Sequence, residues 1–559
     1  MTILIKTDLS MLRRTSFFAI LLLCFAMLGV SACKERKPTA ELRDDKNLRL
    51  ERCVALRGNG THIVAHATGL ARLTSQWGVI DAMAGGSSAT ISTFIYESML
   101  MNPGVIGLDA MSRKDAVALL LKSLVGFAEQ LSTEPEWQSL QSAVVIGQKL
   151  KSHKVFEIPP SDLTKLAASL KTALRSDDIK NLVNPDILRM LEPTADVEYG
   201  GFKNRVLEVR KAALSLVDLD ATDPDVFFRQ GLINFPYFVG MIGRVGDFYA
   251  GRDVDQLRFK DFLNDCSPGT SDLLWKDIAI RKARVGTCGE AFTSLVRSWR
   301  SVYQKRESSR LKEPPGLGMA SIMITSVVQD TDGVNALKSY DQQYQSGLDR
   351  KLALNFEAVK FGYWTSLGLP SNLIHSWRNS STDAKAQKAV GLGYPKTWRE
   401  ILEKSPREPS LGKVVEFGPD ESAAGAVSLG GWADLHPVQV LRFAGCKEII
   451  YLTRRTGETS FITKGRPFEG RPRFGLAELL GMPEADYDRI YSLDAESSSY
   501  SSALRDANGV WCTDWNKFAA QEQSDIALDS WQAPLVTRGS HFSTWPSVDK
   551  SGRKIIGCN

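Results

Sequence analysis

The chain has 559 residues, 43% of them apolar, so it is long enough for several domains or for one large elaborated domain. Its formal net charge is +5, of which residues 1–32 carry +2, so about +3 remains on the rest of the chain. This small charge, without a basic stripe interleaved with aromatic side chains, argues against a nucleic-acid partner.

The first 32 residues have the features of an export signal. Two arginines precede an apolar stretch, residues 17–30, and small residues follow before Cys33. A basic start, a short apolar run and small residues at the cut are typical of a secretory signal. A cysteine in this position resembles a bacterial lipobox, which implies removal of residues 1–32 and a lipid on the Cys33 thiol. The alternative is an ordinary signal peptide with a chance cysteine.

The lipobox resemblance also implies a location. In Gram-negative lipoproteins an aspartate after the lipid cysteine implies retention in the inner membrane, so Lys34 implies the outer membrane. Residues 33–50 are charged and are interpreted as a tether. Beyond the signal, no apolar run is long enough to span a bilayer.

Residues 51–106 are predicted to alternate strands with helices. The predicted elements are a strand at 53–56, a glycine turn at 57–60, a helix at 62–76, a strand at 79–83 and a helix at 90–101. A strand–helix–strand–helix order favours a parallel α/β sheet.

Ser87 stands at the bend between the second of these strands and the helix after it. Small residues flank it, and bulk at Gly85 or Ala89 would clash in so tight a turn. A serine in such a turn is lifted out of the sheet, and the N-terminus of the following helix stabilises developing negative charge. Ser87 is therefore a candidate nucleophile, and the alternative is a plain Gly/Ser loop.

Residues 107–312 are predicted to form a largely helical insertion. Helical periodicity covers 113–131, 136–152, 204–217 and 290–304. The sheet is predicted to resume within residues 313–456. The elements expected there are strands at 319–328, 356–363, 413–416 and 448–452 and helices at 397–403 and 437–444. Residues 457–559 are loop-rich and are interpreted as a C-terminal extension.

Six cysteines remain when the one in the signal and Cys33 are set aside, and an even number in an exported protein permits disulfides. The favoured pairs, both in loop-rich sequence, are Cys266–Cys288 and Cys512–Cys558. Cys53 and Cys446 lie in or beside predicted core strands and are expected to be buried thiols. The histidines and cysteines fit no metal motif, so neither a metal nor a cofactor is expected.

Three landmarks resemble the patatin-like phospholipase family. Residues 57–62 (Arg-Gly-Asn-Gly-Thr-His) are similar to its glycine-rich oxyanion loop, with Asn59 in place of the middle glycine. Residues 85–89 are similar to its Gly-x-Ser-x-Gly turn. Residues 429–437, with the helix and strand after them, are similar to the family's segment that begins Asp-Gly-Gly. Upstream of them, residues 405–409 are similar to the Ala-Ser-x-x-x-Pro segment that precedes it in the family.

The resemblance implies a three-layer α/β/α core with a parallel sheet and a lipid acyl hydrolase activity of the phospholipase A or esterase type. It implies Ser87 as the nucleophile, with the backbone amides of Gly58, Asn59 and Gly60 as oxyanion donors. A membrane lipid or a lipid ester is the implied substrate. The family's catalytic aspartate would stand at Leu429, and a leucine cannot accept a proton.

Asp434 is the candidate base in its place, since it is the nearest carboxylate after the Gly430-Gly431 turn, and His436 is a second candidate. Each has a structural alternative: Asp434 could cap the helix that starts near Pro437, and His436 could pack there. Two other functions remain open. One is a lipoprotein that keeps the fold and binds a lipid or a partner without catalysis. The other is an α/β-hydrolase esterase that uses Ser87, Asp434 and His541.

Overall fold

The structure is a computed structural model that describes the chain in segments. The described segments all belong to one compact unit within residues 49–559. Apart from single residues at 142 and 185, the described segments are 50–58, 63–140, 160–183, 234–267, 278–303, 306–346, 358–367, 370–380, 388–407, 414–430, 437–454, 509–513 and 540–544.

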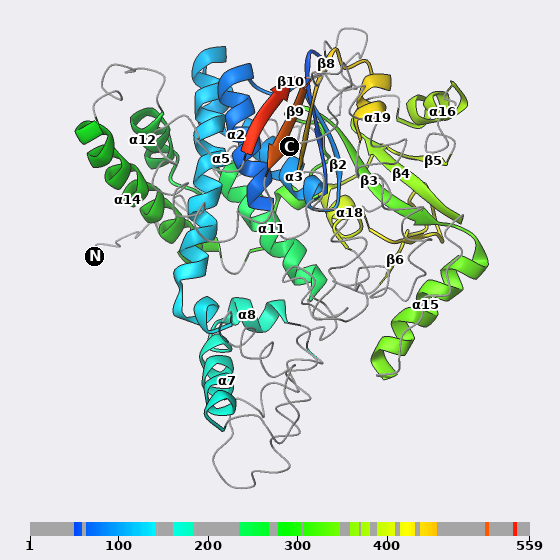
Figure 1. The fold of residues 1–559 in the computed structure, drawn as a ribbon, viewed down its shortest axis with the longest axis horizontal. Helices are drawn as coiled ribbons and strands as arrows, with labels where there is room; N and C mark the ends of the chain where they lie inside the picture. The colour runs from blue at the N-terminus through cyan, green and yellow to red at the C-terminus, as the bar shows by residue number, and fades with distance from the viewer. Residues whose placement is uncertain are drawn as a thin grey trace, which may run out of the picture. The chain divides into compact units, whose positions relative to one another are not determined.

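Strands gather towards the two ends of the chain, and helices occupy the middle (Figure 1). The strands are β1 (Arg52–Leu56), β2 (Ala82–Gly86), β3 (Ala320–Val328), β4 (Val359–Thr365), β5 (Ala389–Gly393), β6 (Val415–Glu416), β7 (Val427–Ser428), β8 (Glu448–Arg454), β9 (Gly509–Thr513) and β10 (Ser540–Thr544).

The helices include the 3₁₀ turn η5. They are α2 (Ile63–Trp77), α3 (Ser88–Leu100), α4 (Pro103–Ile106), α5 (Ala110–Thr133), α7 (Pro160–Ala173), α8 (Asp177–Leu182), α11 (Phe235–Tyr249), α12 (Gln256–Cys266), α14 (Ile278–Tyr303), η5 (Arg310–Lys312), α15 (Thr331–Ser346), α16 (Pro370–Ser380), α18 (Trp398–Leu402) and α19 (Val438–Phe443). None of the described helices is both long and apolar enough to cross a membrane.

The strands form one mixed sheet. Eight of them follow the order β10-β9-β8-β1-β2-β3-β4-β5, and β6 and β7 attach beside β3. The five central strands, from β9 to β3, run parallel, as predicted for an α/β core. The sheet is largely parallel; the expectation of a parallel sheet is wrong at β4 and β7, which run antiparallel to β3, and in the C-terminal region β10 runs antiparallel to β9.

The reversal at β4 has a simple cause. Val328, the last residue of β3, pairs with Val359, the first residue of β4, so the chain returns along β3. Helix α15 lies beyond this end of the pair and does not cross the sheet (Figure 1). A helix between two strands usually indicates a parallel crossover. The sequence pattern does not reveal that this helix instead connects two antiparallel neighbours.

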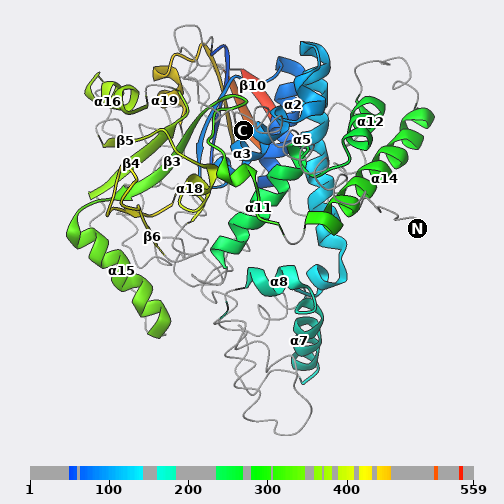
Figure 2. The ribbon, with the colours of Figure 1, turned by 180° about the vertical axis from the view of Figure 1, so that it is seen from behind.

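Helices cover both faces of the central sheet (Figure 2). α2, α3, α5 and α11 pack together on one side, while α16 and α19 contact each other and the sheet on the other. Between β2 and β3, the elements in the described residues of 107–312 are all helices. This segment shares its core with the sheet.

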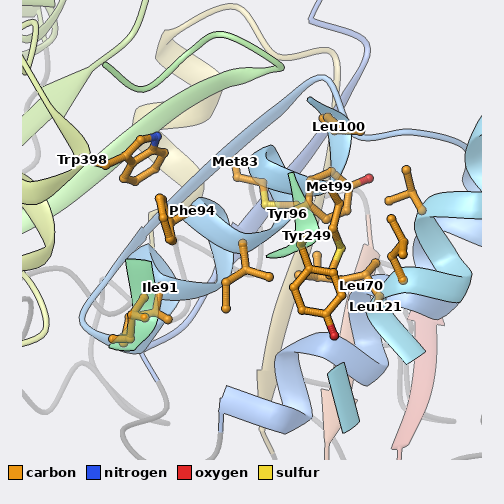
Figure 3. Close-up of a cluster of buried hydrophobic side chains, with 14 of the residues drawn as sticks. Leu70, Met83, Ile91, Phe94, Tyr96, Met99, Leu100, Leu121, Tyr249 and Trp398 are labelled. Atoms are coloured by element: carbon orange, nitrogen blue, oxygen red, sulfur yellow. The ribbon is translucent and has the colours of Figure 1, made fainter. Parts of the chain in front are cut away.

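The core is densest around α3, whose thirteen residues are all buried (Figure 3). Phe94 packs edge-on against Trp398 of α18, with ring centroids 5.3 Å apart. Tyr96 and Tyr249 bury their rings on the helical side, and burial raises the pKa of Tyr96 to about 12. A helix enclosed on all sides has little freedom to shift, so α3 is a rigid support for the turn that precedes it.

The second strand begins at Ala82, three residues later than predicted. The residues before it serve a turn: the Ile80 N–H donates to the Tyr96 hydroxyl at 3.1 Å, and the Asp81 carboxylate accepts from the Arg52 N–H at 2.9 Å. Ile80 is buried against α3, and the sequence pattern does not separate such burial from strand pairing.

The C-terminal region contributes to the sheet. β9 pairs with β8 in parallel, and β10 pairs with β9, so the sheet continues past the expected end of the core at residue 456. Short strands in a long polar region carry little sequence signal of their own.

Two disulfides are present among the described residues. Cys266–Cys288 is confirmed, although it joins α12 to α14 instead of lying in loops. The expectation of buried thiols at Cys53 and Cys446 is wrong, because the two are bonded to each other with Cα atoms 6.1 Å apart. Both are buried as expected; what the sequence does not show is that β1 and β8 are neighbours.

We expect the Cys53–Cys446 bond to stabilise the fold more than the Cys266–Cys288 bond. It spans 393 residues of sequence instead of 22, and a longer closed loop removes more entropy from the unfolded chain, by about 2 kcal/mol here. Thermal unfolding of the Cys53→Ser/Cys446→Ser and Cys266→Ser/Cys288→Ser variants measures the difference. Both pairs are buried, so each variant is a control for the other, and a smaller loss in the first would contradict the expectation.

Candidate active site

Ser87 lies at the turn between β2 and α3, as predicted. Its backbone has φ 56° and ψ −128°, a region that L residues other than glycine seldom adopt. Holding a non-glycine residue there costs about 1–3 kcal/mol, and such strain concentrates at functional sites. The turn is therefore held in place by its surroundings.

The Ser87 hydroxyl does not cap the helix that follows it. A serine at this position usually accepts a hydrogen bond from the first turn of the helix. Here the Ser87 carbonyl oxygen accepts from the Thr90 N–H at 3.0 Å and from the Thr90 hydroxyl at 2.6 Å, while the side chain makes no cap bond. Within the described part of the chain, the Ser87 hydroxyl has no hydrogen-bond partner, and the residue is partly exposed.

Small residues allow this turn to close. A Cβ atom on Gly85 would lie 2.4 Å from the Ala89 Cβ and 2.9 Å from the Leu56 carbonyl oxygen. Neither neighbour can give way easily, since one belongs to a buried helix and the other to the backbone of β1. A side chain at position 85 would therefore clash with Ala89 and with the backbone of Leu56, as the sequence predicts.

The glycine loop and Ser87 lie at the same edge of the sheet. β1 and β2 run parallel with Leu56 opposite Gly85, and Gly58 and Ser87 each come two residues later. Adjacent strands are about 4.8 Å apart, so the two segments emerge as neighbours.

His66 joins the start of this loop to α3. Its ring is buried, with Nε2 donating to the Arg57 carbonyl oxygen at 2.8 Å and Nδ1 lying 2.9 Å from the Ser92 hydroxyl. A carbonyl oxygen only accepts, so the proton in the first contact belongs to Nε2. The sequence analysis gave His66 no role, and a histidine on an apolar helix face carries no signal that reveals one.

Ser405 contacts the backbone of Ser87. The Ser405 hydroxyl accepts from the Ser87 N–H at 3.0 Å and donates to the Ile324 carbonyl oxygen of β3 at 2.5 Å. Ser405 belongs to the segment 405–409 that resembles the family's Ala-Ser-x-x-x-Pro segment, and no role was predicted for it.

The segment at Leu429 and Gly430 is fixed beside β3. The Gly430 carbonyl oxygen accepts from the Ser326 N–H at 2.6 Å and from the Thr325 hydroxyl at 3.2 Å. Ile324, one residue earlier in β3, pairs with Gly86, so this segment lies near the nucleophile turn. Leu429 is only 1% exposed, which places an apolar side chain in the protein interior where the family resemblance expects a carboxylate.

A buried carboxylate lies behind the turn. Glu97 of α3 accepts from Arg310 at 3.0 Å, from the Trp398 indole N–H at 3.1 Å and from the Gly316 N–H at 2.7 Å. Burial raises the pKa of Glu97 above its usual range, and the Arg310 guanidinium acts in the opposite direction. The Arg310 guanidinium also donates to Glu313 at 2.6 Å, so the charges are paired in the interior.

Several predicted site residues lie outside the described residues. These are Cys33, Asn59, Gly60, Asp434, His436 and Cys558. Cys512 in β9 and His541 in β10 are described by their backbone alone. In the described part of the chain, no group of three or more histidine, cysteine or acidic side chains is arranged to hold a metal ion.

Comparisons of the chain with protein-family models, with curated proteins and with solved structures each found no match.

We expect Ser87→Gly to be more stable than Ser87→Ala by about 1–2 kcal/mol, because glycine adopts the backbone conformation of this turn without strain. Denaturant unfolding of the two variants gives the comparison. The matched pair Lys338→Gly and Lys338→Ala, in the interior of α15, should show the opposite order by about 1 kcal/mol. A less stable glycine variant at position 87 would mean that the turn is not strained.

Proposed function

We propose that the chain is an exported serine acyl hydrolase of the patatin-like type, acting on a lipid ester. The proposal is carried by one observation, the strained serine between β2 and α3 whose hydroxyl is not used as a cap. A plain Gly/Ser loop would place its serine in an unstrained conformation or use it to cap the helix.

In the proposed reaction the Ser87 oxygen attacks the carbonyl carbon of the ester while a base takes the hydroxyl proton. The acyl–oxygen bond then breaks, and the leaving alcohol takes that proton. Water, activated by the same base, attacks the acyl-enzyme, and the carboxylic acid and the Ser87 hydroxyl are released. Each step needs a stabilised oxyanion and a base within reach.

The oxyanion would lie between the glycine loop and the start of α3. The N–H of Gly58 and those of Asn59 and Gly60 are the proposed donors, since the loop emerges beside Ser87. The N-terminus of α3, directly after Ser87, adds a favourable partial positive charge.

Asp434 is the proposed base, and it follows Gly430 by four residues. Gly430 is fixed to Thr325 and Ser326 of β3, the strand that pairs with β2, and β2 leads directly to Ser87.

An exported, lipid-anchored location is also part of the proposal. Cys33 would carry the lipid and hold the enzyme at a membrane, the outer one, beside its substrate. The two disulfides support export, because such bonds persist in oxidising compartments.

The second candidate function is a lipoprotein that binds a lipid or a partner without catalysis. One observation favours it: Leu429 is apolar and buried at the position where the resemblance expects the base. The α/β-hydrolase alternative is less favoured, because β10, which carries His541, lies four strands from β2, about 19 Å at the usual strand spacing.

A fluorophosphonate probe should label the detergent-solubilised full-length protein on Ser87. The probe reacts with an activated serine hydroxyl, so mass spectrometry of the digested protein should place the adduct on the peptide containing residue 87. Ser87→Ala should abolish labelling and lower hydrolysis of a short-chain ester by at least about 10³-fold. Ser123→Ala, which removes a buried hydroxyl bonded to Leu120 and Tyr249, is the control. An unlabelled wild type would favour the binding protein.

Asp434→Asn should reduce hydrolysis by at least about 10²-fold if Asp434 is the base, since a general base contributes about 10²–10⁴-fold. Leu429→Asp should raise the rate if the site is otherwise intact, because it puts a carboxylate where the resemblance expects one. Leu429→Asn controls for polarity and size. A loss of only a few-fold in Asp434→Asn would assign that residue to helix capping.

A further inference from the structure

The Ser405 hydroxyl links the turn at Ser87 to strand β3 through two hydrogen bonds. Its oxygen accepts the Ser87 N–H at 3.0 Å, and its proton goes to the Ile324 carbonyl oxygen at 2.5 Å. The side chain is fully buried and comes from 318 residues further along the chain. It therefore connects the turn after β2 to the backbone of β3 by a contact that neither strand pairing nor helix capping provides.

Ser405 is itself held on both sides. Its N–H donates to the Ile401 carbonyl oxygen of α18 at 2.8 Å. The preceding Lys404 pairs with Glu421 at 2.7 Å, and the following Arg407 stacks over the Phe235 ring of α11 at 4.3 Å. A hydroxyl on so constrained a segment has a fixed position, which is what a group must have to hold a strained neighbour.

The Ser87 N–H has few alternatives to this partner. Among the described residues, the acceptor of the Ser87 N–H is the Ser405 hydroxyl, while the Ser87 carbonyl oxygen accepts from Thr90. Removing the Ser405 oxygen takes away the acceptor that the described residues provide for this partly buried N–H, and it lets the turn relax towards an unstrained conformation.

We propose that Ser405 is a positioning residue for the Ser87 nucleophile: its hydroxyl fixes the Ser87 N–H and thereby keeps the backbone in the conformation that presents the side-chain oxygen. The catalytic part of this inference rests on the proposed function. The structural part, that Ser405 holds the turn, rests on the geometry alone. A displacement of about 1 Å at a reacting atom costs on the order of 10²-fold in rate, so a small relaxation of the turn is enough to matter.

The test uses the full-length protein in detergent with three variants. Ser405→Ala removes both hydrogen bonds, Ser405→Thr keeps a hydroxyl, and Ser123→Ala removes an equally buried hydroxyl elsewhere. We expect Ser405→Ala to lower the fluorophosphonate labelling rate and kcat for a short-chain ester by about 10–100-fold with little change in KM. Ser405→Thr should recover most of the rate, and Ser123→Ala should match the wild type.

Amide hydrogen exchange of residues 84–90 supplies a readout that does not depend on catalysis. Ser405→Ala should speed exchange at the Ser87 amide at least 10-fold more than exchange in β1 and β8, which separates a local effect from general unfolding. If Ser405→Ala labels at the wild-type rate, or if the Ser87 amide exchanges unchanged, the proposal is wrong.

A wild type that does not react with the probe would overturn the proposed function and the catalytic role of Ser405 with it. The exchange measurement would then still decide whether Ser405 holds the turn. Equal losses of rate in Ser405→Ala and Ser405→Thr, with equal losses of thermal stability, would assign the residue to packing and also overturn the proposal.

Discussion

The buried carboxylate of Glu97 is the interaction on which the arrangement around Ser87 depends. It lies in α3, the helix that starts directly after Ser87, and its donors come from η5, from the turn before β3 and from α18. One side chain thus ties the nucleophile's helix to the segments that lead into β3 and towards Ser405. Losing one partner of such a buried pair costs about 3–5 kcal/mol, a large share of the roughly 5–15 kcal/mol that stabilises a typical domain.

The same network binds the helical segment to the sheet. Asp247 of α11 is buried and accepts from the Ser309 and Arg310 N–H groups at 3.1 and 3.0 Å, beside the Arg310–Glu97 pair. At its other end, α11 places Phe235 against Arg407, two residues from Ser405. Both ends of α11 are therefore held in place beside the Ser87 turn. Moving α11 would break buried polar contacts at one end and the Arg407 stacking at the other.

Sequence patterns identified the elements whose signal is local. The strand at Cys53, the Ser87 turn and the Cys266–Cys288 bond are each set by residues close in the chain. The features that depend on strand order were missed or misread: the Cys53–Cys446 bond, the antiparallel β4 and the contribution of β9 and β10. Ser405 and Glu97 were missed for the same reason, because the partners of their side chains lie at least 81 residues away and no periodicity encodes such pairing.

The strain at Ser87 and the burial of Leu429 favour different functions, and their energies indicate how to weigh them. Glycine would adopt the turn without cost, so a serine there carries a penalty of about 1–3 kcal/mol that the fold offsets through Ser405 and the buried contacts behind α3. A leucine at position 429 carries no such penalty, since apolar burial is favourable in itself. The strain at Ser87 lowers the stability of the fold and needs a functional explanation, whereas the burial of Leu429 raises the stability and needs none. The strained serine is therefore the stronger support for the proposed hydrolase than the buried leucine is for the proposed binding protein.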